Sequence, residues 1–268
     1  MHFSTFVFLA VFCGAATGNT NRLLSWLLTY TTAALPTYNT NTLYPKDCSA
    51  HAASFNLDRR ERRGHFKRTP SVDIQALTCI AAPETTLMNY VPPPLRQDIA
   101  EGQTGLPLTL DIGVIDVTSC QPMQDVVVEV WSSNALGNYG DNFLRGAFAT
   151  ATNGVAEFQT IFPGFTSDSA NHISLMVHTN SALSGTVAHG GQVFFTDRWT
   201  DVVTMTAPYN SNTNTRVLNA QDSNYALANS GGYNAVVDIE SIHDDWPEGV
   251  IGYITVGVDP ERKVEVPQ

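Results

Sequence analysis

Residues of the types that carry out chemistry are present in this chain, but few of them fall into a recognisable local pattern. The sequence has no Gly-x-Ser-x-Gly turn, no Gly-x-x-x-x-Gly-Lys-Ser/Thr loop, no Gly-x-Gly-x-x-Gly fingerprint and no His-Glu-x-x-His motif. His178, His189 and His243 each stand alone in the sequence. A lone histidine is more often a core or surface residue than a ligand, so we expect these three to be structural. Any site must therefore be built from residues that the fold brings together.

The elements available to position such residues are short β-strands. Apolar residues at 108, 110, 112 and 114 alternate with smaller or polar ones, and a similar run follows at 126–131. Further strands are expected at Val155–Phe162, His172–His178, Gln192–Thr196, Asp201–Met205, Ala235–Ile239 and Val250–Val258. Turns are expected at Asn153-Gly154, Pro163-Gly164, Ser184-Gly185, Gly190-Gly191 and Gly231-Gly232. This spacing predicts an all-β fold, a two-sheet β-sandwich, with a surface excursion between Pro208 and Gly232.

The N-terminal quarter of the chain differs from this body. Residues 1–18 contain an apolar run too short to span a bilayer, followed by small residues, as in a secretion signal, although a buried helix is an alternative. We expect residues 19–74 to be a pro-segment or a poorly structured leader, 75–260 to form the sandwich, and 261–268 to be a tail. The protein is thus expected to be extracellular, without a membrane anchor.

Charge is distributed unevenly along the chain. Six of its 14 Lys and Arg residues lie between Arg59 and Arg68, and Lys67-Arg68 is either a dibasic processing site or part of a solvated linker. From Thr69 onward, six basic residues stand against 22 acidic ones. So acidic a body argues against nucleic acid as a partner.

The four cysteines, at positions 13, 48, 79 and 120, allow several pairings. If the signal and the pro-segment leave, Cys79 and Cys120 remain as the natural pair, and a bond closing that loop would stabilise the fold by roughly 4 kcal/mol. Without cleavage, Cys48 is left over and an intermolecular bridge becomes possible.

Several segments in a fixed order resemble one known family. They are Ile112–Pro122, Val128–Asn134, Gly137–Tyr139, Phe143–Gly146, Phe158–Gly164, His172–Ser174, Gly191–Phe195, Pro208–Asn210 and Gly252–Gly257. Together they resemble the intradiol ring-cleavage dioxygenases, and more closely their secreted fungal branch, over about residues 78–258. The resemblance implies a β-sandwich that holds Fe(III) and uses O₂ to cleave a catechol-like ring.

The same resemblance implies an iron site made by two tyrosines and two histidines, since hard Fe(III) favours phenolate donors. Tyr139 matches the first tyrosine, in Trp-x-x-Asn-x-x-Gly-x-Tyr, and His172 matches the first histidine of a His-x-His pair. Thr166 stands at the second tyrosine and Ser174 at the second histidine, while Ser169 replaces an arginine that balances the charge of bound substrate. Gln192 matches a position near the substrate, although a role in strand packing is equally compatible with it.

Three functions remain open at this point. The first is ring cleavage, with Asp168 joining Tyr139 and His172 in a three-ligand iron site. The second is a non-catalytic module that binds an aromatic compound or a cell-wall polymer in the same cleft. The third is a secreted scaffold that binds no small molecule. Because two of four ligands and the assisting cation are replaced by small neutral residues, we expect an iron site that has decayed.

Overall fold

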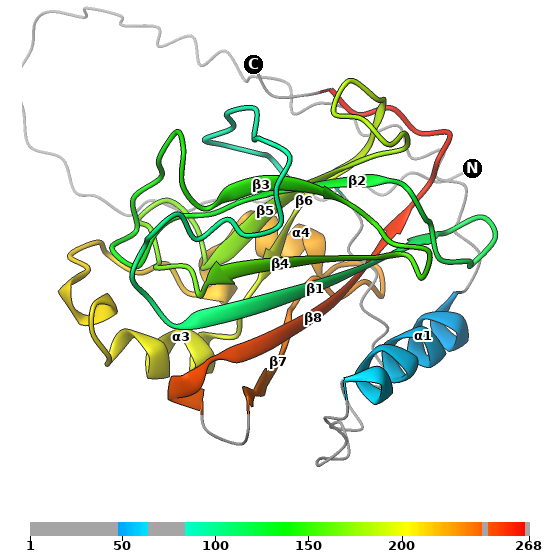
Figure 1. Ribbon diagram of the computed structural model, residues 1–268. Helices are drawn as coiled ribbons and strands as arrows, with labels where there is room; N and C mark the ends of the chain where they lie inside the picture. The colour runs from blue at the N-terminus through cyan, green and yellow to red at the C-terminus, as the bar shows by residue number, and fades with distance from the viewer. Residues whose placement is uncertain (1–47, 64–83, 243–245, 266–268) are drawn as a thin grey trace, which may run out of the picture. The chain divides into compact units, whose positions relative to one another are not determined.

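The computed structural model describes residues 48–63, 84–242 and 246–265, all within the second of two units of the chain, Leu43–Gln268. Two four-stranded sheets make up most of it (Figure 1). One sheet has the order β4-β1-β8-β7, with β4 at Val155–Ile161, β1 at Pro107–Asp116, β8 at Val250–Val258 and β7 at Asp238–Ser241. The other has the order β3-β2-β5-β6, with β3 at Arg145–Ala149, β2 at Val127–Trp131, β5 at His172–His178 and β6 at Val187–Phe194. The prediction of an all-β, two-sheet fold is confirmed.

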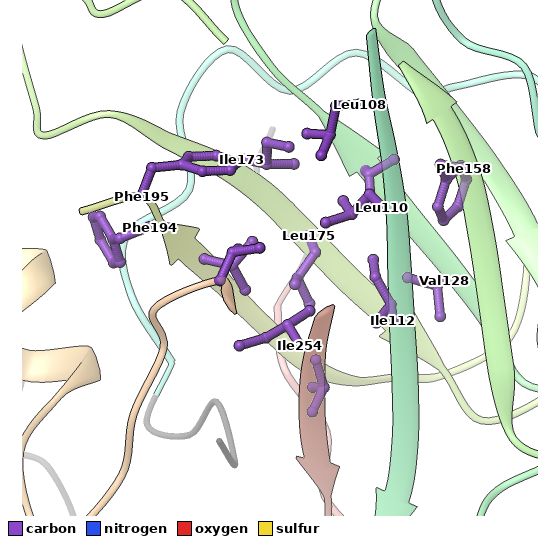
Figure 2. Packing of buried hydrophobic residues seen from close by; sticks show 14 of the residues in the cluster. Leu108, Leu110, Ile112, Val128, Phe158, Ile173, Leu175, Phe194, Phe195 and Ile254 are labelled. Atoms are coloured by element: carbon purple, nitrogen blue, oxygen red, sulfur yellow. The ribbon is translucent and has the colours of Figure 1, made fainter. Parts of the chain in front are cut away.

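The core lies between the two sheets, where side chains of alternate residues meet (Figure 2). Leu108, Leu110 and Ile112 of β1 face Ile173 and Leu175 of β5 in one apolar cluster. Because side chains alternate along a strand, the intervening residues of β5 face outward: His172, Ser174, Met176 and His178. They are nevertheless buried, since Leu87, Tyr90, Tyr139 and Val264 pack over this outer face.

Short helices lie between β6 and β8 in the chain. They are α3 at Asp197–Thr204, η1 at Tyr209–Ser211, η2 at Asn219–Gln221, α4 at Ser223–Ala228 and η4 at Trp246–Glu248. The strand predicted at Asp201–Met205 is wrong, because Thr196 accepts a hydrogen bond from the backbone N–H of Trp199 and caps α3 instead. The turn predicted at Gly190-Gly191 is also wrong, because both residues pair with β5 inside β6. A side chain at position 190 would press on Leu87, which lies over the outer face.

Helix α1, at Ser49–Arg62, corrects the prediction of a poorly structured leader for this part of the chain. A disulfide joins Cys48 to Cys120, with Cα atoms 5.3 Å apart, so the predicted Cys79–Cys120 pairing is wrong. Phe55 packs with Ile115 of β1, and Gly113 leaves room for the Phe55 ring because any side chain there would collide with it. Cys79, Lys67-Arg68 and the expected signal all lie outside the described residues.

Arg59 and Arg60 of α1, and Arg63 directly after it, are held by acidic residues on the outer face of the β1 sheet. Arg59 Nη1 lies 2.5 Å from Asp111 Oδ1 with both side chains buried, and Arg60 Nη2 lies 2.5 Å from Asp238 Oδ2. Arg60 also pairs with Glu240, and Arg63 pairs with both Asp111 and Glu157. This part of the basic run is therefore an interface within the fold. No helix among the described residues is long and apolar enough to cross a membrane.

Candidate functional site

The structure brings four of the predicted site residues together around the ring of His172, the first residue of β5. Tyr139 approaches from the loop after β2, Ser169 from the loop before β5, and Gln192 from β6. Ser174 lies two residues along β5, directly opposite Gln192 in the strand pairing. The cluster thus sits at one end of the buried outer face of the β5 sheet.

The hydrogen bonds of His172 define the role of each ring nitrogen. Nδ1 lies 2.8 Å from the carbonyl oxygen of Ala170, which can only accept, so Nδ1 carries the proton. Ser169 Oγ lies 3.2 Å from the same nitrogen. Nε2 is then the acceptor, 3.0 Å from Gln192 Nε2 and 3.4 Å from Tyr139 Oη. This arrangement leaves His172 neutral, and the lone pair of its Nε2 is directed at Gln192 and Tyr139.

Burial supports the neutral form of His172. Desolvation lowers the pKa of this imidazole below its ordinary value, and only the contact with Ala170 and the distant charge of Asp222 oppose the effect. Asp222 also fixes the loop, because its Oδ2 accepts a hydrogen bond of 2.7 Å from the N–H of Ala170. Asp222, 50 residues after His172 in the chain, therefore fixes the backbone of Ala170, whose carbonyl oxygen orients the His172 ring.

Tyr139 is positioned by a turn that explains the spacing of the motif around it. Asn134 Oδ1 accepts hydrogen bonds from the N–H groups of Leu136 and Asn138, each at 3.1 Å. Gly137 has a φ of +77°, and a side chain there would collide with the carbonyl oxygen of Phe165. Asn134 and Gly137 thus bend the chain so that Tyr139 reaches His172.

The phenol of Tyr139 is hard to ionise in this setting. Burial, with the nearby negative charge of Asp168, raises its pKa to about 12, and Arg145 opposes this shift without cancelling it. The guanidinium of Arg145 is occupied by the carbonyl oxygens of Gly140 and Val91, at 2.8 and 3.0 Å. Tyr139 is therefore a neutral hydrogen-bond donor at neutral pH.

Thr166 and Ser174, which stand where the family resemblance implies a tyrosine and a histidine, differ in how close they lie to this cluster. Thr166 is half-buried, and its hydroxyl accepts a weak 3.4 Å bond from the N–H of Asp168. Ser174 is buried, and neither its Oγ nor Oε1 of Gln192 has a hydrogen-bond partner among the described residues. Two unpartnered polar atoms, on facing residues of neighbouring strands, thus lie beside the Tyr139–His172 pair.

The donors present do not fit the Fe(III) ion that the family resemblance implies. That ion needs anionic oxygen ligands, and Tyr139 supplies one phenol, whereas Thr166 and Ser174 are alcohols that stay neutral. Asp168 is exposed, and no group of three or more His, Cys, Asp or Glu residues that could hold a metal occurs in the part of the chain described. The hydrogen-bond partner of His172, a carbonyl on Nδ1, is nevertheless the kind that orients a ligating histidine.

The remaining histidines lie elsewhere. His178 is buried on the same face of β5, with Nε2 2.5 Å from Glu129 Oε1 and Nδ1 3.1 Å from the carbonyl of Gly185. His189 is buried on β6, and burial together with Arg262 lowers its pKa to about 4. His243 lies outside the described residues. The sequence did not predict the Glu129–His178 pair. The one sequence feature that indicates it is that both residues face outward on strands that pair with each other.

Comparison with solved structures identifies the fold. The structure is similar to an intradiol ring-cleavage dioxygenase from Tetranychus urticae, with 25% sequence identity, a TM-score of 0.61, and coverage of 69% of this chain and 98% of that one. A second dioxygenase matches with 25% identity, a TM-score of 0.60 and the same coverage. A 3-chlorocatechol 1,2-dioxygenase from Rhodococcus opacus 1CP is more distant, at 15% identity and a TM-score of 0.49, covering 80% of this chain and 88% of that one.

Searches against protein-family models and against curated protein sequences gave no match. The structural neighbours of this chain are thus intradiol ring-cleavage dioxygenases, and its two sheets are consistent with the sandwich fold of that family.

Proposed function

We propose that this chain is a secreted relative of the intradiol ring-cleavage dioxygenases that has lost the iron-dependent reaction of that family. The fold likeness and the retained Tyr139 and His172 support descent from such an enzyme. The replacement of the other two ligand positions by Thr166 and Ser174 supports the loss of iron.

One observation carries this proposal, namely the replacement of two of the four ligand positions by the neutral alcohols Thr166 and Ser174. Tyr139 Oη and His172 Nε2, 3.4 Å apart, are the two donors that would remain for iron. Two strong donors hold Fe(III) far less well than the four in the site that the resemblance implies.

Metal content and colour test the proposal directly. The purified full chain is incubated with Fe(III), desalted, and examined by elemental analysis and visible spectroscopy. We expect far less than one iron per chain and no visible absorption band, because tyrosinate bound to Fe(III) would give a charge-transfer colour. Stoichiometric iron with such a band would contradict the proposal.

A restored site gives the complementary measurement. The variant Thr166→Tyr, Ser174→His and Ser169→Arg returns the residue types that the resemblance implies. We expect it to gain iron and visible absorption, because the fold that places Tyr139 and His172 together is retained. Adding Tyr139→Phe to the triple variant is the matched control, and it should remove or shift the band.

A second candidate function, metal-free binding of a hydroxylated aromatic compound, is favoured by the two unpartnered atoms. Ser174 Oγ and Gln192 Oε1 are buried and lack partners among the described residues, and such groups usually mark a missing hydrogen-bonding guest or a water. A catechol hydroxyl could donate to Gln192 while Tyr139 donates to the other oxygen. Calorimetric titration with catechol, repeated with chelator and with Gln192→Leu, tests this: binding should survive the chelator and weaken in the variant.

Secretion is the part of the proposal that concerns location. The Cys48–Cys120 disulfide supports it, because such bonds persist in oxidising compartments. Expression of the full chain in a eukaryotic secretory host should release protein into the medium, with cleavage near residue 18. Retention of an intact N-terminus inside the cell would argue for the alternative of a buried helix.

A further inference from the structure

A groove of about 780 Å³ lies away from the His172 cluster, among α3, α4, β7 and η4. None of Tyr139, His172, Ser174 and Gln192 lines it. Its volume falls within the range of small-molecule sites, roughly 300–1,000 Å³. The groove is thus a second hollow, and no predicted site residue belongs to it.

Four aromatic side chains from four different segments line the groove: Trp199, Tyr225, Tyr233 and Trp246. All four are partly exposed, whereas the fully buried aromatic residues belong to the core. Tyr225 is held in place by an edge-to-face contact with Phe194, with ring centroids 5.2 Å apart. The groove therefore has aromatic side chains from several segments in its wall.

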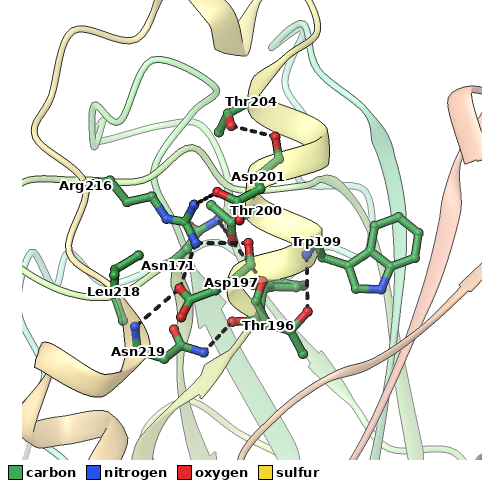
Figure 3. Close-up of polar contacts among 12 residues, drawn as sticks. Asn171, Thr196, Asp197, Trp199, Thr200, Asp201, Thr204, Arg216, Leu218 and Asn219 are labelled. Carbon is green, nitrogen blue, oxygen red and sulfur yellow. Dashed lines mark hydrogen bonds and ion pairs between the residues drawn. The ribbon is translucent and has the colours of Figure 1, made fainter.

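Helix α3 is anchored on one side and lines the groove with three residues, Arg198, Trp199 and Val202. Arg216 binds Asp197 at 2.7 Å and also pairs with Asp201, on the side of α3 away from Trp199 (Figure 3). Arg198, next to Trp199, lines the groove and is exposed. It has no ion-pair or hydrogen-bond partner in the described ranges, whereas Arg216 is saturated by carboxylates.

The polar groups left open in this groove are mainly hydrogen-bond donors. Side-chain acceptors are already engaged: Asp238 by Arg60, Asn229 Oδ1 by the N–H of Ala235, Asn234 Oδ1 by the N–H of Val236, and Thr196 Oγ1 by the N–H of Trp199. The guanidinium of Arg198 and the indole N–H groups of Trp199 and Trp246 make no hydrogen bond within the described structure.

We propose that this groove binds an aromatic carboxylate, with the carboxylate on Arg198 and the ring packed between Trp199 and the facing aromatic side chains. A planar guanidinium pairs with a carboxylate through two parallel hydrogen bonds. An aromatic ring fits better than a sugar, because it can pack on the aromatic side chains of the groove, and four of the side-chain acceptors that sugar hydroxyls would need already accept other hydrogen bonds. The proposal rests on the groove alone and does not depend on the loss of iron at His172.

Isothermal titration calorimetry of the full chain tests this with three probes of matched size or charge. These are 2-naphthoate, its neutral analogue 2-naphthamide, and galacturonate as an acidic sugar. We expect 2-naphthoate to bind most tightly. Arg198→Gln should weaken 2-naphthoate about tenfold or more, because a charge-assisted hydrogen bond is lost, and should leave 2-naphthamide unchanged. Arg62→Gln, which removes an exposed arginine of α1, is the matched control and should change neither.

Two further variants locate the binding. Trp199→Leu should weaken both naphthyl probes, whereas Gln192→Leu should weaken neither. Equal affinity for 2-naphthoate and 2-naphthamide would overturn the proposal, as would tighter binding of galacturonate, the absence of binding by all three probes, or sensitivity to Gln192→Leu without sensitivity to Arg198→Gln. Because none of these titrations measures iron, their failure is distinguishable from the failure of the proposal about iron at His172.

Discussion

Two buried polar regions, the α1 interface on the β1 sheet and the His172 cluster on the β5 sheet, handle polar residues in different ways. On the β1 sheet, charged groups are buried as pairs under α1, with Arg59, Arg60 and Arg63 each bound to one or two carboxylates. Around His172 on the β5 sheet, the buried polar groups are neutral, and two of their atoms lack a partner. The first region uses polarity to fix a helix in place. The second leaves Ser174 Oγ and Gln192 Oε1 able to hydrogen-bond a ligand or a water.

Breaking the buried ion pair under α1 should have the largest effect. Asp111→Ala leaves Arg59 buried without the carboxylate that lies 2.5 Å from it, which costs roughly 3–5 kcal/mol in buried pairs. We expect a matching loss in the free energy of unfolding in urea. Asp259→Ala, at a half-buried position just after β8 and outside any ion pair of the described residues, is the control. A loss below 1 kcal/mol would contradict a buried Arg59 that depends on Asp111.

Removing the disulfide should have the next largest effect. The double variant Cys48→Ser and Cys120→Ser opens a link between residues 72 positions apart, for which a loss of roughly 2–4 kcal/mol is typical. Thermal unfolding measures the change, with Cys79→Ser as the control. If Cys79→Ser destabilises the protein as strongly as the double variant, the pairing described here is not the one that forms.

The two histidines on the outer face of β5 should respond to pH in opposite directions. For His178, burial alone would lower the pKa, but the hydrogen bonds to Glu129 and Gly185 outweigh it and raise the pKa. Its stabilising effect is thus complete below the unfolded value of about 6.5 and is lost as pH rises through the folded pKa. For His172 the pKa is lowered, so the protein loses stability as pH falls below about 6.5, because the unfolded chain takes up the proton first.

Glu129→Gln sharpens this contrast. It should destabilise the protein by about 1–2 kcal/mol at pH 6, since a charge-assisted bond becomes a neutral one, and by much less once His178 is deprotonated. Histidine side-chain NMR should show His178 titrating above His172 in the wild type. The reverse order would contradict the assignment of charge to the Glu129–His178 pair and of neutrality to His172.

The smallest expected change in stability concerns two buried serines, Ser133 and Ser174. Ser133 Oγ donates a 2.5 Å hydrogen bond to the carbonyl of Gly164, whereas Ser174 Oγ has no partner among the described residues, and both side chains are at most 2% exposed. Ser133→Ala should cost about 1 kcal/mol, and Ser174→Ala should cost nothing or stabilise slightly. A larger loss for Ser174→Ala would show that its hydroxyl has a partner in solution.

Strand patterns predicted the sheets well, because alternation is local. The bounds of β5 and β8 agree with the sequence to the residue, and the family resemblance named Tyr139, His172 and Gln192, which the structure brings together. Their role in holding a metal stays a prediction. Asp201–Met205 was misassigned because the capping bond of Thr196 begins a helix that the apolar residues alone do not distinguish from a strand.

The interface of α1 could not be predicted from local pattern. Arg59 finds Asp111 52 residues away, and Arg60 finds Asp238 178 residues away, so a basic run that suggested a linker turned out to match acids on three later strands. The Cys79–Cys120 pairing failed for a related reason. It assumed that everything before Arg68 is discarded, whereas Cys48 is bound to the body of the protein. The groove at Trp199 combines residues from four elements and leaves no motif in the sequence.

The bond between Cys48 and Cys120 also determines what a protease could release. A cut after Arg68 would yield two polypeptides but still one molecule, because the shorter piece would stay attached through its cysteine and its arginines. Such a product would run as a single band on a non-reducing gel and as two bands after reduction. Maturation at that site would therefore produce a two-chain protein rather than free a propeptide.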